Sequence, residues 1–364
     1  LNYNKNLSYA QVFLSLIMKI ADYLIVGDGY AALFFAHRLI MENKSFYLFS
    51  ENKQSASRVS AGIINPVVLK KFTTFWLAQE QIYDLQKTLS EMAKYTGQNY
   101  WVNEPIHRIF HNVKERELWQ KKANDETLSG FLTTAFVSFD TILNPFGTGM
   151  VDQSARLNVS RFFHDFFKFL SENDRFIPEQ FDYNALNPAQ NQYKTIEYKN
   201  IVFCEGMGVV ENPFFKDIPL QPNKGHHLKV KISKPIRTKV TLKKKHFLFP
   251  LEDDLYYYGG TYDRNESHHD IDETAKDQLV KGLEEFYPEP FDVVDVQFGF
   301  RPTVKDRRPI LGNHHEFKNL FVFNGLGARG ILNGNYFAGE LFQLIEHGKP
   351  LPEEVSLERF TQTK

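Results

Sequence analysis

The sequence predicts an α/β protein of two domains, one assembled from separated segments on a parallel sheet and one inserted into it on a mainly antiparallel sheet. Three observations support this expectation. An apolar run, two glycines and a helical pattern follow one another at 22–41. Two more short apolar runs that end in glycine, KNIVFCEG and NLFVFNG, occur in the middle and near the end of the chain. Between about 221 and 300, runs such as HHLKVKI, KHFLFPL and VDVQFGF are typical of strands.

The first elements predict a βαβ unit, with a strand at 22–26, a helix at 30–41 and a strand at 45–50. Such a unit takes about 30 residues. In its turn, Gly27 permits the tight bend, Gly29 lets the backbone approach a ligand, and Ala32 is small where helix and strand pack closely. Free N–H groups at the start of a helix bind pyrophosphate. The pattern indicates a Rossmann-like nucleotide site, and the alternative is a glycine turn that only packs.

An acidic residue at the end of the second strand normally holds the ribose of the nucleotide. In this chain Ser50 stands at that position and Glu51 follows it. Either side chain could bind the ribose, Ser50 more weakly. Asp28, between the two glycines, is expected to face solvent or to cap the turn.

The remaining elements follow the same alternation of helices and strands. Residues 55–67 form a small-residue loop, and 75–95 and 157–173 are predicted helices, the second with Asn158 and Ser160 as cap residues. The predicted nucleotide-binding domain comprises 18–85, 145–220 and 299–364, and the predicted substrate domain comprises 86–144 and 221–298. Residues 1–17 are expected to be an N-terminal extension, whose apolar segment 10–18 is too short to span a bilayer.

Composition excludes several classes of function. A net charge of −1 over 364 residues gives no basic footprint for nucleic acid or for an anionic membrane. The single cysteine, Cys204, excludes an intramolecular disulfide and a Cys-rich zinc site, and it fits a cytoplasmic location. The His pairs at 226–227, 268–269 and 314–315 do not predict a metal site, because adjacent side chains on a strand diverge. The 34 Phe and 17 Tyr reflect either general composition or an aromatic-walled cavity.

Two C-terminal motifs resemble the signature of the D-amino acid oxidase family of flavoproteins, which includes glycine oxidase, sarcosine oxidase and the oxidase half of a bifunctional tRNA-modifying enzyme. They are GFRPTVKDRRPILG (299–312) and NLFVFNGLGARGILNGNYFAGEL (319–341). SASRVSAGIINP, IVFCEGMG and YYYGGTYD resemble other segments of the family, so that the resemblance covers about 20–345. It implies FAD rather than NAD. The FAD-binding residues that it adds are Arg58, Ser60, Ala61, Gly62, Gly206, Gly325, Gly327, Gly330 and Ile331.

The resemblance also implies the chemistry, which is removal of a hydride from the carbon next to an amine to give an imine that hydrolyses. Arg301 matches the arginine that clamps a substrate carboxylate, the alternative being a structural salt bridge. Arg329 contacts either the substrate or only the flavin edge. Members of the family often add a tyrosine hydroxyl on the strand that here has His246, Phe247 and Phe249. Tyr257 or Tyr258 could replace it, but strand alternation sends them to opposite faces.

The sarcosine oxidase branch of the family attaches its flavin through a cysteine near the segment that corresponds to RPTVKD. No cysteine lies there in this chain, so the resemblance implies non-covalent FAD. The expected partners are a small amine or amino acid as substrate and oxygen or another electron acceptor. Lys71 and Lys224 are candidates for a lysine over the flavin. Two alternatives stay open: a flavoprotein that acts on a modified nucleobase amine, and a catalytically silent flavin-fold subunit.

Overall fold

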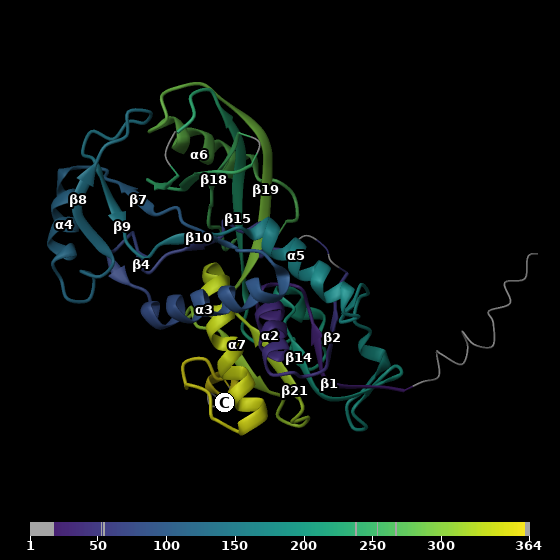
Figure 1. Ribbon diagram of the computed structural model, residues 1–364. Helices are drawn as coiled ribbons and strands as arrows, with labels where there is room; N and C mark the ends of the chain where they lie inside the picture. Colours follow the sequence, from purple (N-terminus) through teal and green to yellow (C-terminus); the bar gives the residue numbers. More distant parts are fainter. Residues whose placement is uncertain are drawn as a thin grey trace, which may run out of the picture.

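The computed structural model of the protein describes residues 18–51, 53, 55–236, 239–252, 254–265 and 268–360. A mostly parallel sheet forms the lower half of the molecule in Figure 1. Its parallel neighbours are, in order, β11 (Phe176–Ile177), β2 (Phe46–Phe49), β1 (Lys19–Val26), β14 (Ile196–Phe203) and β21 (Leu320–Asn324). Antiparallel additions are β20 (Ile310–Asn313) on β21, and β13 (Gln192–Tyr193) with β12 (Leu186–Asn187) on β14. The expected N-terminal extension, 1–17, lies outside the described residues.

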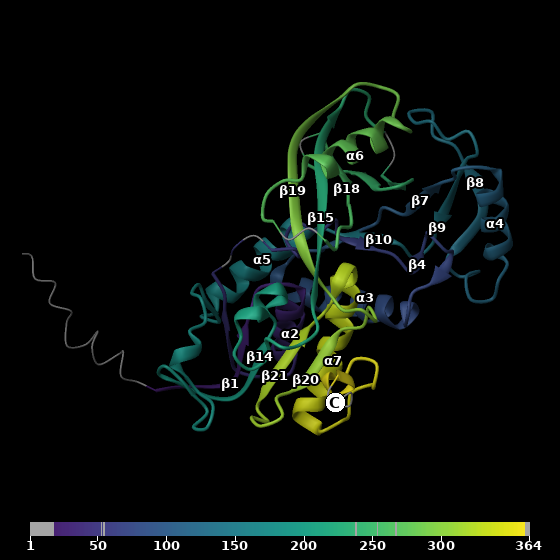
Figure 2. The same cartoon turned by 180° about the vertical axis from the view of Figure 1, so that it is seen from behind.

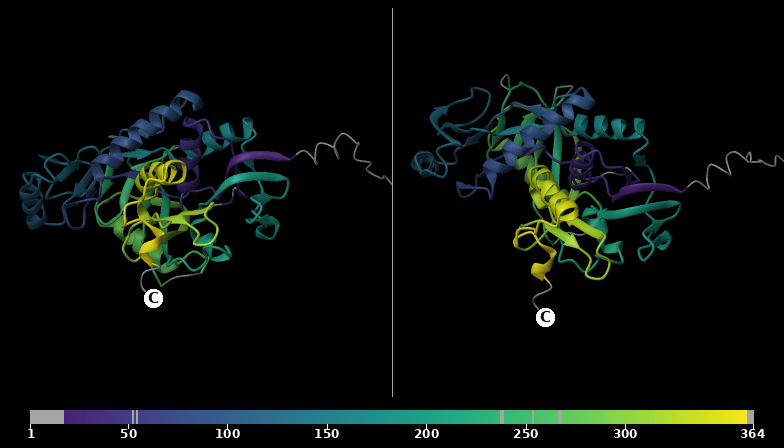
Figure 3. Two further views of the ribbon diagram at one scale, coloured as in Figure 1. Left: turned by 90° about the horizontal axis from the view of Figure 1, so that it is seen from below. Right: turned by 60° about the horizontal axis from the view of Figure 1, so that its bottom comes forward.

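Helices α2 (Tyr30–Met41), α3 (Ala78–Thr96) and α7 (Gly330–His347) pack together beside this sheet, as Figure 3 shows for the yellow α7, the purple α2 and the blue α3. Helix α5 (Val159–Glu172) adds five apolar side chains to the same core, and Asn158 caps it by accepting a hydrogen bond from the Arg161 N–H, as predicted. Residues from the first strand and from the last helix therefore share one core.

The second sheet, in the upper half of Figure 1, has eight strands and is antiparallel except for one pair. Its order is β19 (Phe291–Thr303), β15 (Gln221–Ile232), β18 (Leu255–Gly259), β17 (Phe247–Pro250), β16 (Thr241–Lys243), β7 (Ile106–Ile109), β9 (Thr148–Val151) and β8 (Leu132–Val137). Helix α6 (Glu273–Glu284) packs on one face of this sheet, and α4 (Val113–Ala123) packs on β8. The opposite face carries α4 over β9 and meets the parallel-sheet half of the molecule toward β15 and β19.

Strands β15 and β19 connect the two halves. They are paired from Gln221 and Thr303 at one end to Ile232 and Phe291 at the other, with one register shift between Lys229 and Val230. Figure 2 shows both strands running from the upper layer down toward β20 and β21. Arg301 lies near the lower end of β19, where that strand contacts η2 (Gly206–Glu211) and η3 (Gly327–Arg329).

Short elements complete the description. A three-stranded sheet contains β3 (Ile63–Ile64), β10 (Ala155–Leu157) and β6 (Trp101–Val102), and a hairpin contains β4 (Val67–Val68) and β5 (Thr73–Thr74). The remaining 3₁₀ turns are η1 (Tyr183–Ala185) and η4 (Leu357–Phe360). No helix in the described part of the chain combines the length and apolarity needed to cross a membrane.

The predicted fold class is confirmed, with a βαβ unit at the start and strands β14 and β21 adding to its sheet from far along the chain. The predicted domain ranges stay a prediction. Strand β9 lies in the antiparallel sheet although 145–220 was assigned to the nucleotide-binding domain, and α3 packs on α7 although its residues after 85 were assigned to the substrate domain.

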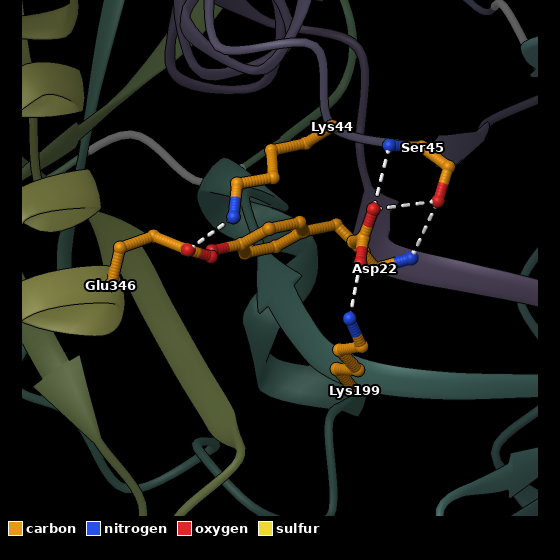
Figure 4. Close-up of polar contacts among 6 residues, drawn as sticks. Asp22, Lys44, Ser45, Lys199 and Glu346 are labelled. Carbon is orange, nitrogen blue, oxygen red and sulfur yellow. Dashed lines mark hydrogen bonds and ion pairs between the residues drawn. The ribbon is translucent and has the colours of Figure 1, made fainter.

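Polar contacts at the start of β1 fasten the parallel sheet to its surroundings (Figure 4). The Asp22 carboxylate accepts hydrogen bonds from the Ser45 N–H at 2.9 Å and from Lys199 Nζ at 2.7 Å. Burial alone would raise the pKa of Asp22, but these partners lower it to about 2. On the next residue, the Tyr23 hydroxyl donates to Glu346 of α7, which also pairs with Lys44. These contacts tie β1 to β14, to the start of β2 and to the last helix.

Candidate functional site

A cavity of about 760 Å³ lies between the two halves of the molecule. Its walls come from the β1–α2 turn, the 55–70 segment, the end of β14, the loop before α7, and the free face of the antiparallel sheet. Many of the predicted site residues line it, although they are far apart in the sequence: Gly27, Gly29, Ser60, Ala61, Gly62, Gly206, Arg301, Gly327, Arg329, Gly330 and Ile331. The described lining is rich in aromatic side chains.

The first glycine turn has the geometry of an anion cradle. Gly27 has φ +121°, and a Cβ atom there would lie 2.3 Å from the Cys204 carbonyl oxygen, so only glycine fits. Gly29 is the N-cap of α2 and provides no side-chain cap. The first N–H groups of the helix therefore open toward the cavity.

A second cradle meets the first from the C-terminal part of the chain. Helix α7 begins at Gly330, also without a side-chain cap. A Cβ atom on Gly330 would lie 2.9 Å from the Tyr30 ring, so the starts of α2 and α7 are adjacent. Gly325 and Gly327 both have positive φ, and the Asn324 amide, which donates to the Gly206 carbonyl at 2.9 Å, holds this loop against β14. Two uncapped helix starts and glycines that tolerate no Cβ fit a dinucleotide such as FAD.

Tyr30, which sequence reasoning did not identify as a site residue, joins the first cradle to the 55–62 segment. Its hydroxyl lies 2.7 Å from Ser60 Oγ, and its N–H donates to Ser57 Oγ at 3.3 Å. Both contacts place Ser60, Ala61 and Gly62 along the cavity wall.

Five predicted cofactor residues are not part of the described cavity lining: Ala32, Ser50, Glu51, Arg58 and Gly325. Ala32 is fully buried in the core between α2 and the sheet, in the packing role expected for it. Glu51 is exposed and pairs with Lys53 at 2.8 Å. Arg58 lies against the rings of Phe163 and Phe167 on α5, with its Nε 3.6 Å from Asp28.

Of the two expectations for Asp28, the solvent-facing one is wrong, because its half-buried carboxylate lines the cavity beside Arg58. The other, that Asp28 caps the turn, stays a prediction. Burial raises the pKa of Asp28, and the Arg58 charge and a hydrogen bond with Ser50 oppose this rise. Ser50 thus contacts the turn itself, through Asp28.

Glu205 is a second carboxylate on the cavity wall that the sequence did not single out. It accepts hydrogen bonds from the Tyr183 hydroxyl and from the Asn212 amide, the latter at 2.7 Å. Burial raises the pKa of Glu205 to about 7, although both hydrogen bonds act to lower it. The only sequence signal was its place directly after a buried strand, next to Gly206.

Arg301 lies on the free face of the antiparallel sheet and donates to Asn223 Oδ1 and to the Thr261 carbonyl, both at 3.1 Å. Its guanidinium carbon is 4.5 Å from the centre of the Tyr262 ring. Within the described residues, Arg301 has no acidic partner, and the salt-bridge alternative finds no support there. Glycine at position 225, on the neighbouring strand β15, leaves the space that the Arg301 guanidinium occupies. A Cβ atom on Gly225 would lie 2.2 Å from the guanidinium nitrogens.

Tyr257 and Tyr258 point to opposite faces of β18, as alternation predicts. Tyr257 lines the cavity, whereas Tyr258 is buried in the core under α6. The Tyr257 ring stacks between His227, at 4.5 Å, and Phe249, at 4.6 Å. A Cβ atom on Gly260 would lie 3.5 Å from the Tyr257 hydroxyl and 3.1 Å from an Arg301 nitrogen, so these two groups converge above Gly260.

Arg329 is the second guanidinium of the cavity. It donates to the Asn65 carbonyl at 3.1 Å and lies 3.8 Å from the centre of the Phe75 ring. Burial lowers the pKa of Arg329 to about 10, which leaves it a cation at neutral pH. Its position at the start of α7 puts it between the second cradle and the open cavity.

The predicted lysines are not the ones that line the cavity. Lys224 points to the other face of β15, where its ammonium donates to the carbonyls of His268 and Asp270 at 2.5 and 2.6 Å, and Lys71 is exposed. Lys70 and Lys243 form part of the lining instead. In the described part of the chain, no group of His, Cys, Asp and Glu side chains could hold a metal ion.

Comparison with known proteins agrees with this geometry. The family model for FAD-dependent oxidoreductases, DAO, matches residues 22–344. The tRNA 5-methylaminomethyl-2-thiouridine biosynthesis bifunctional protein MnmC of Campylobacter jejuni is 22% identical over 334 residues, which are 86% of this chain and 49% of that protein. The chain thus spans about half the length of this relative.

Solved structures show the same fold at low identity. Glycine oxidase from Geobacillus kaustophilus has a TM-score of 0.76 and 16% identity, over 92% of this chain and 96% of that one. Glycine oxidase from Bacillus cereus has a TM-score of 0.76 and 18% identity, over 91% and 98%. Iminodiacetate oxidase from Chelativorans has a TM-score of 0.75 and 14% identity, over 92% and 100%.

The family model covers most of the chain, and it confirms the resemblance first seen in the motifs at 299–341. The chain therefore belongs to the DAO family of FAD-dependent oxidoreductases.

Proposed function

We propose that this protein oxidises the C–N bond of a small amine or amino acid that carries a carboxylate, with non-covalently bound FAD as hydride acceptor. The observation that carries the proposal is Arg301, a guanidinium that lines the cavity without an acidic partner among the described residues. A half-buried cation without an acidic partner is suited to a ligand carboxylate, which it can bind through two parallel hydrogen bonds.

The two cradles are the proposed cofactor site. The N–H groups that follow Gly27 and Gly29 would hold the pyrophosphate, and those at 327–331 would face the pyrimidine edge of the flavin. When bound, FAD supplies an acceptor for two electrons and a hydrogen. The assignment of Ser60, Ala61, Gly62, Gly206 and Ile331 to this site stays a prediction, supported by their place on the cavity wall.

The chain's own contribution is to hold and orient the substrate. Arg301 would bind the substrate carboxylate. The Tyr257 hydroxyl, on β18, would be a further hydrogen-bond donor to it, because both groups converge above Gly260. Arg329 would add a second positive charge from the cofactor side. Aromatic side chains line this part of the cavity, and a bound substrate that displaced water from it would make stronger charged contacts.

The reaction needs placement more than a catalytic base. The substrate amine would lose a hydride from its α-carbon and a proton from its nitrogen, which leaves an imine that water hydrolyses to a carbonyl compound and an amine or ammonia. The electrons would pass on to oxygen or to another acceptor. A substrate held at its carboxylate presents one C–H bond in a fixed direction, and such positioning lowers the barrier substantially.

Non-covalent attachment is supported by the state of Cys204. This thiol is 4% exposed, and burial raises its pKa well above the ordinary value, so that it stays a protonated, poorly reactive group. Acid precipitation should release all of the flavin into the supernatant.

A modified nucleobase amine is the second candidate substrate, because the Campylobacter jejuni relative is named for tRNA 5-methylaminomethyl-2-thiouridine biosynthesis. The net charge of −1 counts against tRNA as the partner. A catalytically silent subunit is the third possibility.

An anaerobic substrate panel separates these candidates. Glycine, sarcosine, D-alanine, D-proline and iminodiacetate are added to the purified holoprotein, and flavin absorbance is followed. Bleaching by one of these amines supports the main proposal. Bleaching only by a nucleoside with an aminomethyl substituent would replace it with the second candidate, and a flavin that no amine bleaches would indicate a silent subunit.

A further inference from the structure

The charged residues of the cavity are segregated. Its described carboxylates, Asp28 and Glu205, lie at the cofactor end, each next to a glycine that lines the cavity. The described lining of the substrate end holds cations instead: Lys70, Lys243, Arg301 and Arg329. If the substrate carried one carboxylate, Arg301 with Arg329 would already neutralise it, and the two lysines would have no role.

Lys243 lies far from Arg301 on the same face of the sheet. Three strands, β15, β18 and β17, separate β19 from β16. At about 4.8 Å per strand, strands β19 and β16 are about 19 Å apart, and the register places Lys243 in the row of Gln297, further along β19 from Arg301. The side chains shorten this span, because the Arg301 guanidinium lies over Gly225 of β15 and the Lys243 ammonium lies over Phe247 of β17.

Among the described residues, the hydrogen-bond and ring partners of the Lys243 ammonium are neutral. The ammonium is 4.4 Å from the centre of the Phe247 ring and donates to the Lys245 carbonyl at 2.5 Å. The described residues offer it no carboxylate, and its charged neighbour is Arg108, whose own partner is Glu115 at 2.6 Å. Burial and the Arg108 charge lower the pKa of Lys243 to about 7. An anion bound beside Lys243 would raise this pKa again, because it stabilises the charged ammonium.

We propose that Lys243, together with Lys70, which also lines the cavity, forms a second anion-binding subsite, and that the natural substrate is an amine with a second anionic group, carboxylate or phosphate, on an extended arm. This inference rests on the proposed function, in which Arg301 binds the first carboxylate. It names Lys243 as a residue that determines specificity, without a part in the chemical step.

Non-oxidisable acids test the subsite by binding alone. Suberate and sebacate are titrated into the holoprotein beside octanoate and decanoate, which match them in length but have one charge. Binding is followed by calorimetry and by the change in flavin absorbance. The wild-type protein should bind the better diacid about tenfold more tightly than the monoacid of the same length. A difference of this size corresponds to one additional charge-assisted hydrogen bond. A terminal phosphonate, 8-phosphonooctanoate, tells whether the subsite prefers phosphate over carboxylate.

Variants assign the preference to one residue. Lys243→Met should abolish the advantage of the diacid and leave octanoate binding unchanged, whereas Lys243→Arg should retain it. Lys245→Gln, on the exposed neighbour, is the control and should behave as the wild type. Flavin content per protein reports whether each variant folds.

The outcomes separate this inference from the proposed function. If octanoate binds but suberate and sebacate bind no better, or if Lys243→Met keeps their advantage, the second subsite is disproved and the carboxylate site stands. If no acid perturbs the flavin or releases heat, the carboxylate site at Arg301 fails, and the subsite fails with it.

Discussion

Replacing Arg301 with alanine should weaken the binding of a carboxylate-bearing amine and leave the fold and the flavin in place. In the structure the guanidinium makes two hydrogen bonds to neutral acceptors, Asn223 Oδ1 and the Thr261 carbonyl. Each such bond contributes about 0.5–1.5 kcal/mol net, so the free energy of unfolding should fall by no more than about 3 kcal/mol. No described carboxylate would be left buried without its partner.

The effect on the ligand should be larger than the effect on stability. Truncating one member of a hydrogen-bonded charge pair costs about 2–5 kcal/mol, and the half-buried position of Arg301 favours the lower part of that range. At about 2–3 kcal/mol, the dissociation constant should rise roughly 30- to 150-fold. The substrate carboxylate supplies this energy, so an amine without a carboxylate should lose almost nothing.

Anaerobic stopped-flow reduction measures the binding of amines with and without a carboxylate, since the dependence of the rate on substrate concentration gives the dissociation constant of each. The control is Arg308→Ala, a nearby arginine whose guanidinium lies 4.0 Å from the centre of the Trp76 ring and that is not part of the described lining. Equal loss for amines with and without a carboxylate, or unchanged binding in Arg301→Ala, would refute the clamp.

Three further predictions use other parts of the site. Gly225→Ala should reproduce the binding defect of Arg301→Ala with a normal flavin content, because its Cβ atom would displace the guanidinium that now lies 2.2 Å from that point; wild-type affinity in this variant would contradict the geometry. Gly27→Ala should purify without flavin and with a lower unfolding temperature. Its Cβ atom would lie 2.3 Å from the Cys204 carbonyl oxygen, and alanine would adopt this backbone conformation at a cost of about 1–3 kcal/mol. A yellow, stable variant would argue against the cradle. Burial raises the pKa of Glu205 from 4.5 to about 7, so the folded protein holds a proton that the unfolded chain releases, and stability should fall as the pH rises between these values. Glu205→Gln should flatten that slope in thermal unfolding followed from about pH 4.5 to 8, and an identical slope in both proteins would exclude Glu205 as its source.

Local structure around the site could be predicted from the sequence. The turn at 27–29 could be recognised because a buried strand, two glycines and a helix follow one another within a short stretch. Alternation along one strand was enough to send Tyr257 and Tyr258 to opposite faces. Arg301 was identified through the family motif and lies on the cavity wall, although its role stays a proposal.

Features that depend on contacts between distant segments could not be predicted. Asp28 was expected to face solvent or to cap the turn, but Arg58, placed by the rings of α5, lies beside it and it is half-buried. Gly225 matters only because the register of β15 and β19 brings it under Arg301. The sequence offered Lys71 as a candidate, whereas its neighbour Lys70 lines the cavity. Lys243 could be found only once the order of strands in the sheet was known.

The long ladder between β15 and β19 has a consequence for how substrates enter. It crosses from the antiparallel sheet to the loops of the cofactor cradles, so a hinge that opened the two halves would have to break consecutive backbone hydrogen bonds. The amides of this ladder should therefore exchange with deuterium among the slowest in the chain. Exposed Tyr262 lies over Arg301 beside the cavity. Its neighbours Thr261 and Asp263 bond to the backbone of β15, so this segment at the edge of the cavity is held to the ladder as well.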